Sequence, residues 1–257
     1  MTFDAFSLNS KKQRLFIILF GIFLSNAIVA EIIGVKIFSL EALIGVPPAH
    51  IPTFWGDTWD FNQTAGALNW PFVFITSDII NEYFGQKGVK RISFITAGFI
   101  AYCFFIIYLA TALPPAQFWL DINKGSDNFN INIAFAKIFR QGLGIITGSL
   151  SAFILSQLID TYIFHSLKKV TGAKKIWLRA TGSTLISQLI DSFVVIGIAF
   201  YVFGNWTVAQ WFSVSLNNYI YKFTVAIVLT PLLYLAHYVI DRYLGEDLAG
   251  QMVEEAI

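Results

Sequence analysis

The hydrophobic pattern of the chain is a series of long apolar runs separated by short polar stretches. Six runs have the roughly 20 apolar residues that a helix needs to cross a bilayer. Helices are expected because lipid offers the backbone no hydrogen-bond partners. We therefore predict an all-α polytopic membrane protein in which six transmembrane helices form a compact bundle. The predicted spans are 15–38, 66–84, 92–113, 141–166, 178–203 and 212–240.

The distribution of Lys and Arg predicts the orientation. If both ends lie inside, the inner segments hold most of the 17 Lys and Arg, and the outer loop 39–65 holds none. Cytoplasmic loops carry such an excess of basic residues. We therefore predict a cytoplasmic N-terminus (1–14), one transmembrane domain (15–240) and a cytoplasmic C-terminal tail (241–257). The basic start and Ser25-Asn26-Ala27 resemble a signal peptide, but the apolar run continues past Ala27, which favours an uncleaved first helix.

The outer loop 39–65 is unusually aromatic for a solvated linker. It contains Pro47-Pro48, Trp55, Trp59 and Phe61. Two interpretations remain open: the loop folds back over the helix ends as a lid, or it lies on the membrane interface.

Composition narrows the class of protein further. Of the 257 residues, 56% are hydrophobic and 13% are charged, whereas soluble domains have about 45–50% apolar and about 25% charged residues. A soluble enzyme, a disordered chain and a disulfide scaffold are excluded. The net charge of +1 argues against a nucleic-acid partner, and Cys103, the one cysteine, has no internal disulfide partner.

Several charged residues fall inside the predicted spans, where each costs roughly 2.5–3.5 kcal/mol on insertion scales. Asp78 is about 12 Å deep at 1.5 Å per residue, and Glu82 follows at i+4 on the same helix face. Structural pairing is one interpretation, with Lys222 as the counter-ion of Asp191 or Asp78. We favour a polar central site built by Asp78, Asp191 and Lys222, because such residues usually mark a substrate or ion path. Further charged residues inside the spans are Glu31 and Asp160.

A short repeat adds polar side chains to two spans. The sequence Ser-Gln-Leu-Ile-Asp occurs at 156–160 and again at 187–191. Within each copy the Ser, Gln and Asp share one helical face. The two helices run in opposite directions, as in the inverted repeats of transporters. Carboxylates and amides together suit a flat, nucleobase-like heterocycle with adjacent N–H donors and a carbonyl, and Asn81, Asn217 and Asn218 add amide groups.

Pairs of small residues predict close helix contacts. Gly144 and Gly148 form one small-x-x-x-small pair, and Gly21 and Ser25 form another.

Three stretches carry a family resemblance. Residues 70–85, which include Ser77-Asp78, Asn81-Glu82 and Tyr83-Phe84-Gly85, are followed by Lys90-Arg91. This pattern resembles a signature of the queuosine precursor transporter family, also called the vitamin uptake transporter family. Residues 157–164 and 177–192 resemble further segments of that family in the same order.

The resemblance implies a multi-pass protein of the bacterial inner membrane that imports 7-cyano- or 7-aminomethyl-7-deazaguanine for salvage into tRNA. Matched positions imply functional roles for Asp78, Asn81, Glu82, Gln157, Asp160, Arg179, Gln188 and Asp191. Lys222 and Asn218 are added as substrate-binding candidates on the depth argument alone.

We predict the following roles. Asp78, Asn81, Gln157, Gln188, Asp191, Asn218 and Lys222 bind substrate. Asp78, Glu82 or Asp160 carries a coupling proton or acts in gating, and Arg91 and Arg179 anchor the cytoplasmic face. We expect no catalytic residue, no metal and no cofactor; the expected partners are the substrate and the bilayer, and a homodimer is left open.

Two other functions are weighed. The chain has no phosphate-binding loop of the type G-x-x-x-x-G-K-S/T, so as a substrate-binding subunit of a multi-component importer it would need a separate ATPase. A membrane enzyme is disfavoured because the chain lacks H-E-x-x-H and G-x-S-x-G and its three His are dispersed.

Overall fold

The computed structural model describes residues 10–52, 58–125, 129–171 and 176–256. Trp55 of the outer loop and Lys174 and Lys175 lie outside the described residues. The helices are α1 (Lys11–Ile33), α2 (Leu40–Leu43), η1 (Ala65–Leu68), α3 (Trp70–Ala112), α4 (Gln117–Ile122), α5 (Ile131–Phe139), α6 (Leu143–Thr171), α7 (Ile176–Ile196), η2 (Gly197–Val202), α8 (Val208–Val228), α9 (Thr230–Leu244) and α10 (Glu246–Glu255). The strands are β1 (Ile37–Ser39), β2 (Ile51–Pro52), β3 (Thr58–Trp59) and β4 (Asn62–Thr64).

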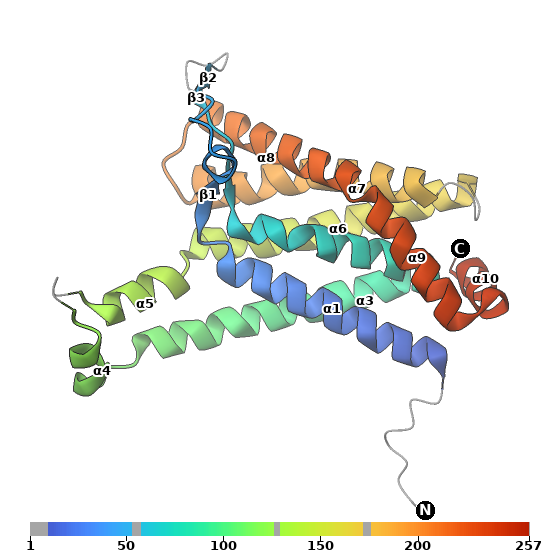
Figure 1. The fold of residues 1–257 in the computed structure, drawn as a ribbon, viewed down its shortest axis with the longest axis horizontal. Coiled ribbons are helices and arrows are strands. Elements are labelled where there is room, and N and C mark those ends of the chain that lie inside the picture. Colours follow the sequence, from blue (N-terminus) through green and yellow to red (C-terminus); the bar gives the residue numbers. More distant parts are fainter. Residues whose placement is uncertain (1–9, 53–57, 126–128, 172–175, 257) are drawn as a thin grey trace, which may run out of the picture.

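The long helices form an elongated bundle (Figure 1). Among the described residues, four helical stretches are long and apolar enough to cross a membrane: Lys11–Ile33, Trp70–Ala112, Ile131–Thr171 and Trp177–Val202. A fifth is added if α8 and α9, which are bent by 44° at their junction, count as one broken span. The helical polytopic membrane fold predicted from the sequence is therefore confirmed.

α3 contains a reversal of the chain at Gly85. This residue has φ 67° and ψ −175°, a backbone conformation that side chains with a Cβ rarely adopt. A Cβ on Gly85 would also lie 3.2 Å from the carbonyl oxygen of Ala256. Figure 1 shows the first part of α3 running toward the chain termini and the second part running back. The sequence predicted two spans here with a connecting loop, and the structure makes the turn at one glycine.

Contacts with α1 confirm this reversal. Asn69, just before α3, donates to the side chain of Asn26 at 3.2 Å. Further along α3, the ring of Phe84 packs on Phe16, near the start of α1, with 5.0 Å between ring centroids. Beyond Gly85 the helix returns along α1, because Phe104 shares a small pocket with Ile28.

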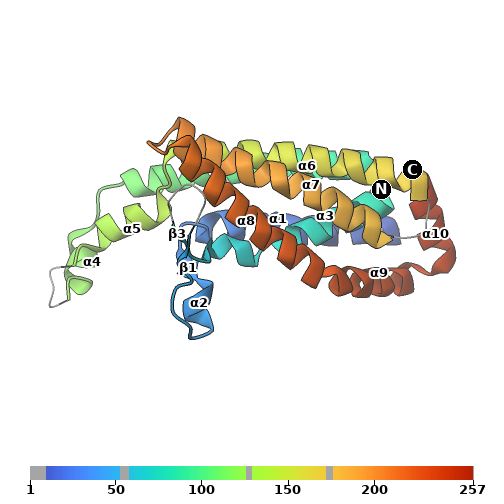
Figure 2. The ribbon, with the colours of Figure 1, turned by 90° about the horizontal axis from the view of Figure 1, so that it is seen from above.

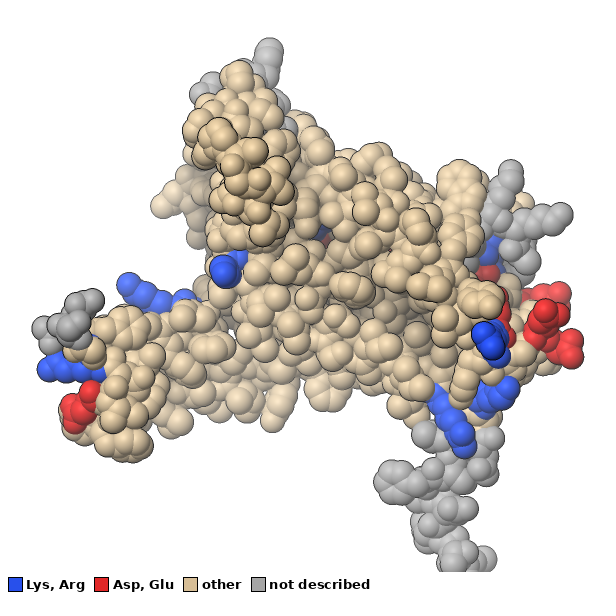
Figure 3. All heavy atoms as spheres, viewed as in Figure 1, with Lys and Arg blue, Asp and Glu red and all other residues tan. Residues whose placement is uncertain are grey.

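Both described ends of the chain lie at the same end of the bundle. Lys12 pairs with Glu255 at 2.9 Å, and Lys11 donates to the carbonyl oxygen of Leu244 at 3.1 Å. We call this the terminal end (residues 10–14, 85–91, 168–171, 176–179 and 242–256). The opposite, loop end comprises residues 34–52, 58–69, 113–125, 129–142 and 203–207. Figure 3 shows Lys, Arg, Asp and Glu gathered toward the two ends.

The segment predicted as a C-terminal tail is helical. α9 and α10 wrap around the terminal end of the bundle (Figure 2). Gly245 separates them with φ 91°, and the side chains of Ala249 and Met252 are buried in the core.

α6 and α7 pack closely because small residues line their contact. A Cβ on Gly148 would lie 2.9 Å from the carbonyl oxygen of Val195, and one on Gly144 would lie 2.6 Å from Cβ of Phe203. The predicted contact through Gly144 and Gly148 is therefore confirmed. The second predicted pair is wrong, because no described atom lies within 4 Å of a Cβ placed on Gly21. Gly21 instead lies on the exposed face of α1.

The outer loop has its own hydrogen-bonded structure. β1 pairs antiparallel with β4 in the register Ile37↔Thr64, Phe38↔Gln63 and Ser39↔Asn62. β2 pairs antiparallel with β3, Ile51 opposite Trp59 and Pro52 opposite Thr58. Asn217 on α8 donates to the carbonyl oxygen of Asp60 at 3.2 Å, which ties the loop to the bundle.

Glu41 organises the loop from its centre. Its carboxylate accepts from the backbone N–H of Phe61 at 2.6 Å, the hydroxyl of Ser39 at 2.8 Å and the N–H of Ala49 at 3.4 Å. These hydrogen bonds favour the ionised form, the one from Phe61 most, and lower the pKa of Glu41 from 4.5 to about 2.

We predict that Gly148→Ala lowers the thermal midpoint of the purified protein in detergent. The added methyl meets a backbone oxygen, which cannot move as a side-chain tip can, and overpacking costs about 1–3 kcal/mol. Gly21→Ala is the matched control, since its methyl meets open space. Equal midpoints for the two variants would contradict the close packing of α6 and α7.

We also predict that the outer loop loses stability in acid. A carboxyl whose folded pKa is lowered stabilises the folded state above its unfolded pKa of 4.5, and this contribution is lost as the pH falls toward about 2. Hydrogen exchange of the peptide that contains Phe61, corrected for the intrinsic pH dependence, should show falling protection over this interval. Glu41→Gln should show low protection at every pH; protection in that variant as high as in the wild type would refute the role of Glu41.

Candidate functional site

A cavity of about 560 Å³ lies inside the bundle. Its wall is built by α1, α3, α6, α7, α8 and α9, together with β1 and β4 of the outer loop. At the loop end it is lined by Ile37, Thr64 and Trp206, and its lining continues to Asp78 and Thr184 within the bundle. The outer loop therefore contributes to the cavity wall, which neither the lid nor the interface interpretation had included.

Five of the side chains predicted to bind substrate line this cavity: Asp78, Gln188, Asp191, Asn218 and Lys222. They come from α3, α7 and α8, segments far apart in the sequence. The structure thus brings together the central polar residues that the depth argument had placed on different helices.

An ion pair crosses from α7 to α8 in the cavity wall. The ammonium of Lys222 contacts the carboxylate of Asp191, and both side chains remain partly accessible, at 14% and 15%. Lys222 is therefore the counter-ion of Asp191, which was one of the two pairings predicted from the sequence. Both residues also line the cavity.

Buried polar atoms in the wall lack protein partners. Oδ1 of Asp78 and both side-chain amide atoms of Gln188 have no hydrogen-bond partner among the described residues. The exposed fraction of Gln188 is 1%. Because buried polar atoms are normally hydrogen-bonded, such atoms beside a cavity mark groups available to a ligand or water.

The two copies of the sequence repeat have different surroundings. Gln188 and Asp191 of the second copy line the cavity, whereas Gln157 and Asp160 of the first do not. Oε1 of Gln157 accepts from the hydroxyl of Ser77 at 2.8 Å, and Asp160 accepts from the hydroxyl of Ser187 at 3.0 Å. The first copy therefore joins α6 to α3 and α7 behind the cavity wall.

Asn81 also lies behind the wall. Its side chain is buried, it is not a lining residue, and its Nδ2 has no partner among the described residues. Neither Asn81 nor Gln157 is therefore among the residues that line the cavity.

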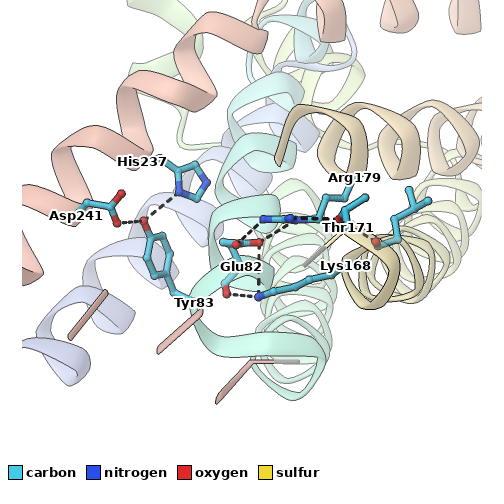
Figure 4. A network of polar contacts seen from close by, with 8 residues as sticks. Glu82, Tyr83, Lys168, Thr171, Arg179, His237 and Asp241 are labelled. Atoms are coloured by element: carbon cyan, nitrogen blue, oxygen red, sulfur yellow. Dashed lines mark hydrogen bonds and ion pairs between the residues drawn. The ribbon is translucent and has the colours of Figure 1, made fainter. Parts of the chain in front are cut away.

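Glu82 belongs to a buried ionic cluster on the terminal side of the cavity (Figure 4). Arg179 donates to both carboxylate oxygens, at 2.6 and 3.2 Å. Lys168 donates to the main-chain carbonyl of Glu82 at 2.7 Å, and its ammonium is 3.6 Å from the carboxylate. All three side chains are at most 3% exposed, so α3, α6 and α7 are joined by charges that water does not reach.

A second contact links the neighbouring residue of α3 to α9. The hydroxyl of Tyr83 donates to Asp241 at 2.6 Å and lies 3.0 Å from Nδ1 of His237. Figure 4 shows these residues beside the Glu82 cluster. Together the two sets of contacts hold α3, α6, α7 and α9 against one another on the terminal side of the cavity.

The two predicted cytoplasmic anchors have different environments. Arg91 is exposed on the second part of α3, whereas Arg179 is fully buried in the Glu82 cluster. No role was predicted from the sequence for Lys168, Tyr83 or His237. The signal available for Lys168 was its helical spacing from Asp160 and Phe164, which are also buried.

Apolar and aromatic side chains complete the wall. Trp70, Phe74 and Phe153 line the cavity together. The ring centroid of Trp70 lies 6.0 Å from that of Phe74 and 5.9 Å from that of Phe153. Such rings offer flat apolar faces to a planar ligand.

Comparison with known proteins identifies the family of the chain. The sequence model of one family, described as "Putative vitamin uptake transporter", matches residues 64–236. No solved structure matches the chain.

Curated relatives come from several bacteria. The chain is 27% identical over 181 residues to the "Probable queuosine precursor transporter" of Bacillus subtilis (strain 168), which covers 70% of this chain and 74% of that protein. It is 27% identical over 169 residues to the "Queuosine precursor transporter" of Escherichia coli (strain K12), covering 65% and 69%. The corresponding protein of Haemophilus influenzae is 25% identical over 175 residues, covering 66% of each chain. The family match spans well over half of the sequence, and the chain therefore belongs to the vitamin uptake transporter family, whose members are transporters and not enzymes.

Proposed function

We propose that this protein imports queuosine precursors, 7-cyano-7-deazaguanine, 7-aminomethyl-7-deazaguanine or both, across the bacterial inner membrane as a secondary transporter. The observation that carries the proposal is the cavity within the bundle that Asp78, Gln188, Asp191, Asn218 and Lys222 line. The relatives named as queuosine precursor transporters support the class of substrate.

The polar wall is suited to the edge of such a base. A deazaguanine edge presents adjacent N–H donors and a carbonyl acceptor. The free oxygen of Asp78 accepts from the N–H groups, and the amide of Gln188 both donates and accepts. Asp191, held by Lys222, supplies a further acceptor from one turn along α7. In this proposal Asn81 and Gln157 position the groups in front of them.

The aromatic wall is suited to the faces of the base. Trp70, Phe74 and Phe153 form a contiguous aromatic surface on one side of the cavity. Stacking on these rings orients a flat ligand, while the polar groups select its edge.

The proposed topology has six crossings with both termini in the cytoplasm. The reversal at Gly85 makes α3 cross twice, and α8 and α9 together form one bent crossing. The terminal end holds Lys11, Lys12, Lys87, Lys90 and Arg91, and under the positive-inside rule this excess of basic residues supports a cytoplasmic location.

In this orientation we propose that the cavity opens outward. The cavity lining includes β1 and β4 at the loop end and no residue from the terminal end. The Glu82 cluster and the Tyr83 contacts lie between the cavity and the cytoplasm. Release of the substrate inward then requires these helices to separate, as alternating access demands. Glu82 acts in gating here, and Asp78 with the neighbouring Asp160 remains the candidate pair for a coupling proton.

We predict that Asp191→Asn reduces import at least about tenfold. The substitution weakens a charge-assisted hydrogen bond and leaves Lys222 without its counter-ion, a loss of more than about 1.4 kcal/mol. The measurement is queuosine in tRNA of a strain that neither makes nor imports the precursors, fed a low concentration of 7-cyano- or 7-aminomethyl-7-deazaguanine.

The control is Asp121→Asn, the same change at an exposed position of α4. Equal queuosine in the two variants, at equal amounts of protein in the membrane, would refute the role of Asp191. No queuosine with the wild type would refute the proposed substrates. Uptake by the purified protein in liposomes would exclude an obligatory partner subunit.

We predict that Glu82→Gln lowers the thermal midpoint far more than Glu255→Gln. Removing the carboxylate leaves Arg179 and Lys168 buried without a counter-ion, and breaking such a buried pair costs about 3–5 kcal/mol. Glu255 pairs with Lys12 in an exposed position, where an ion pair contributes about 0–1 kcal/mol. Thermal unfolding in detergent measures both variants, and similar shifts would contradict the closure that we assign to this cluster.

A further inference from the structure

Glu31 is a buried carboxylate in the cavity wall without a cationic partner. It lies on α1 with an exposed fraction of 6%, and it lines the cavity. The hydroxyl of Ser149 on α6 donates to its Oε1, and Gln141 donates to its main-chain carbonyl at 2.8 Å. Within the part of the chain that the structure describes, no Lys, Arg or His forms an ion pair with Glu31.

Two other carboxylates of the bundle are paired with cations, whereas Asp78 and Asp160, like Glu31, have no ion pair among the described residues. Glu82 has Arg179 and Lys168, and Asp191 has Lys222. Burying an ionised carboxylate is costly unless a cation or several hydrogen bonds compensate it. Glu31 has one side-chain hydrogen bond and faces the cavity, so a cation that enters the cavity would supply the compensation.

The charges of the whole wall favour such a ligand. Its described acidic lining residues are Glu31, Asp78 and Asp191, and its one described basic lining residue, Lys222, is already paired with Asp191. Asp191 lies near enough to Glu31 for the two carboxylates to interact electrostatically. A ligand that carries a positive charge is attracted to this wall, and one that carries a phosphate is repelled.

Gln188 is independent evidence for a ligand in the same place. It is 1% exposed, lines the cavity, and has no protein partner for either amide atom among the described residues. It precedes Asp191 by three residues, about 4.5 Å along α7 at 1.5 Å per residue. The wall therefore offers a donor–acceptor pair for the edge of a heterocycle close to carboxylates suited to a cation.

We infer that Glu31, oriented by Ser149, is the specificity residue that binds a positively charged substituent of the transported heterocycle. The inference rests on the proposed function: of the two proposed substrates, the aminomethyl form is a cation at neutral pH and the cyano form is neutral. The protein prefers the aminomethyl compound over the cyano compound. The charged amine makes a salt bridge with Glu31, while the amide of Gln188 forms hydrogen bonds with the edge of the ring.

The test is uptake of the two compounds by the full-length protein in proteoliposomes at neutral pH. For Glu31→Gln we expect the ratio of aminomethyl to cyano uptake to fall about tenfold, the effect of losing one charge-assisted hydrogen bond. Glu246→Gln on α10, an exposed position outside the cavity, is the matched control and should keep the wild-type ratio. An unchanged ratio in Glu31→Gln, including equal loss of both activities, overturns the inference.

A binding measurement separates this inference from the proposed function. Benzylamine and benzyl alcohol have similar size, and only the amine is charged at neutral pH. Trp70 and Trp206 line the cavity, so intrinsic fluorescence of the purified protein reports binding there. If neither deazaguanine is transported, the proposed function fails; a preference for benzylamine that Glu31→Gln removes still supports the cation site. Lack of that preference in the wild type overturns it.

Discussion

The cost of burying charge within a membrane is the constraint on which this structure depends. Glu82, Arg179 and Lys168 are excluded from water; the two cations compensate the charge of Glu82, and Glu82 compensates theirs. Their helices, α3, α6 and α7, must therefore meet at one place and in one register. The reversal at Gly85, three residues beyond Glu82, returns α3 along α1 from that meeting point. The ionic cluster thus fixes both the packing of the helices and the closed side of the cavity.

The polar residues of the bundle form two kinds of group. In saturated groups the charged atoms have partners within the protein, and in open groups polar atoms beside the cavity have none among the described residues. The Glu82 cluster has its partners within the protein, and the hydroxyl of Tyr83 bonds to Asp241. Asp78 and Gln188 keep polar atoms without partners and face the cavity. Saturated groups hold helices together, whereas open groups are free for a ligand. The same physical rule, that buried polar atoms need partners, thus gives one cluster a role in closure and the other a role in recognition.

Close packing of α6 on α7 decides how the repeated sequence is used. Gly144 and Gly148 bring the backbones together, so the first copy of the repeat faces neighbouring helices, where Gln157 accepts from Ser77 and Asp160 accepts from Ser187. In the second copy, on α7, Ser187 faces α6, whereas Gln188 and Asp191 line the cavity. Two identical pentapeptides therefore serve different purposes, because the neighbours of each helix differ.

The sequence alone determined the class of protein, a helical polytopic membrane protein, because the length of an apolar run is a local property. It also indicated Asp78, Gln188, Asp191, Asn218 and Lys222, which share the cavity. Only the tertiary structure decided which face of each helix meets a neighbour. It showed that Gln188 lines the cavity whereas Gln157 does not, and that Lys168 is buried whereas its neighbour Lys169 is exposed. It also brought Glu31 of α1 beside Asp191 of α7, because contacts between segments 160 residues apart depend on how all the helices pack, and no local pattern encodes them.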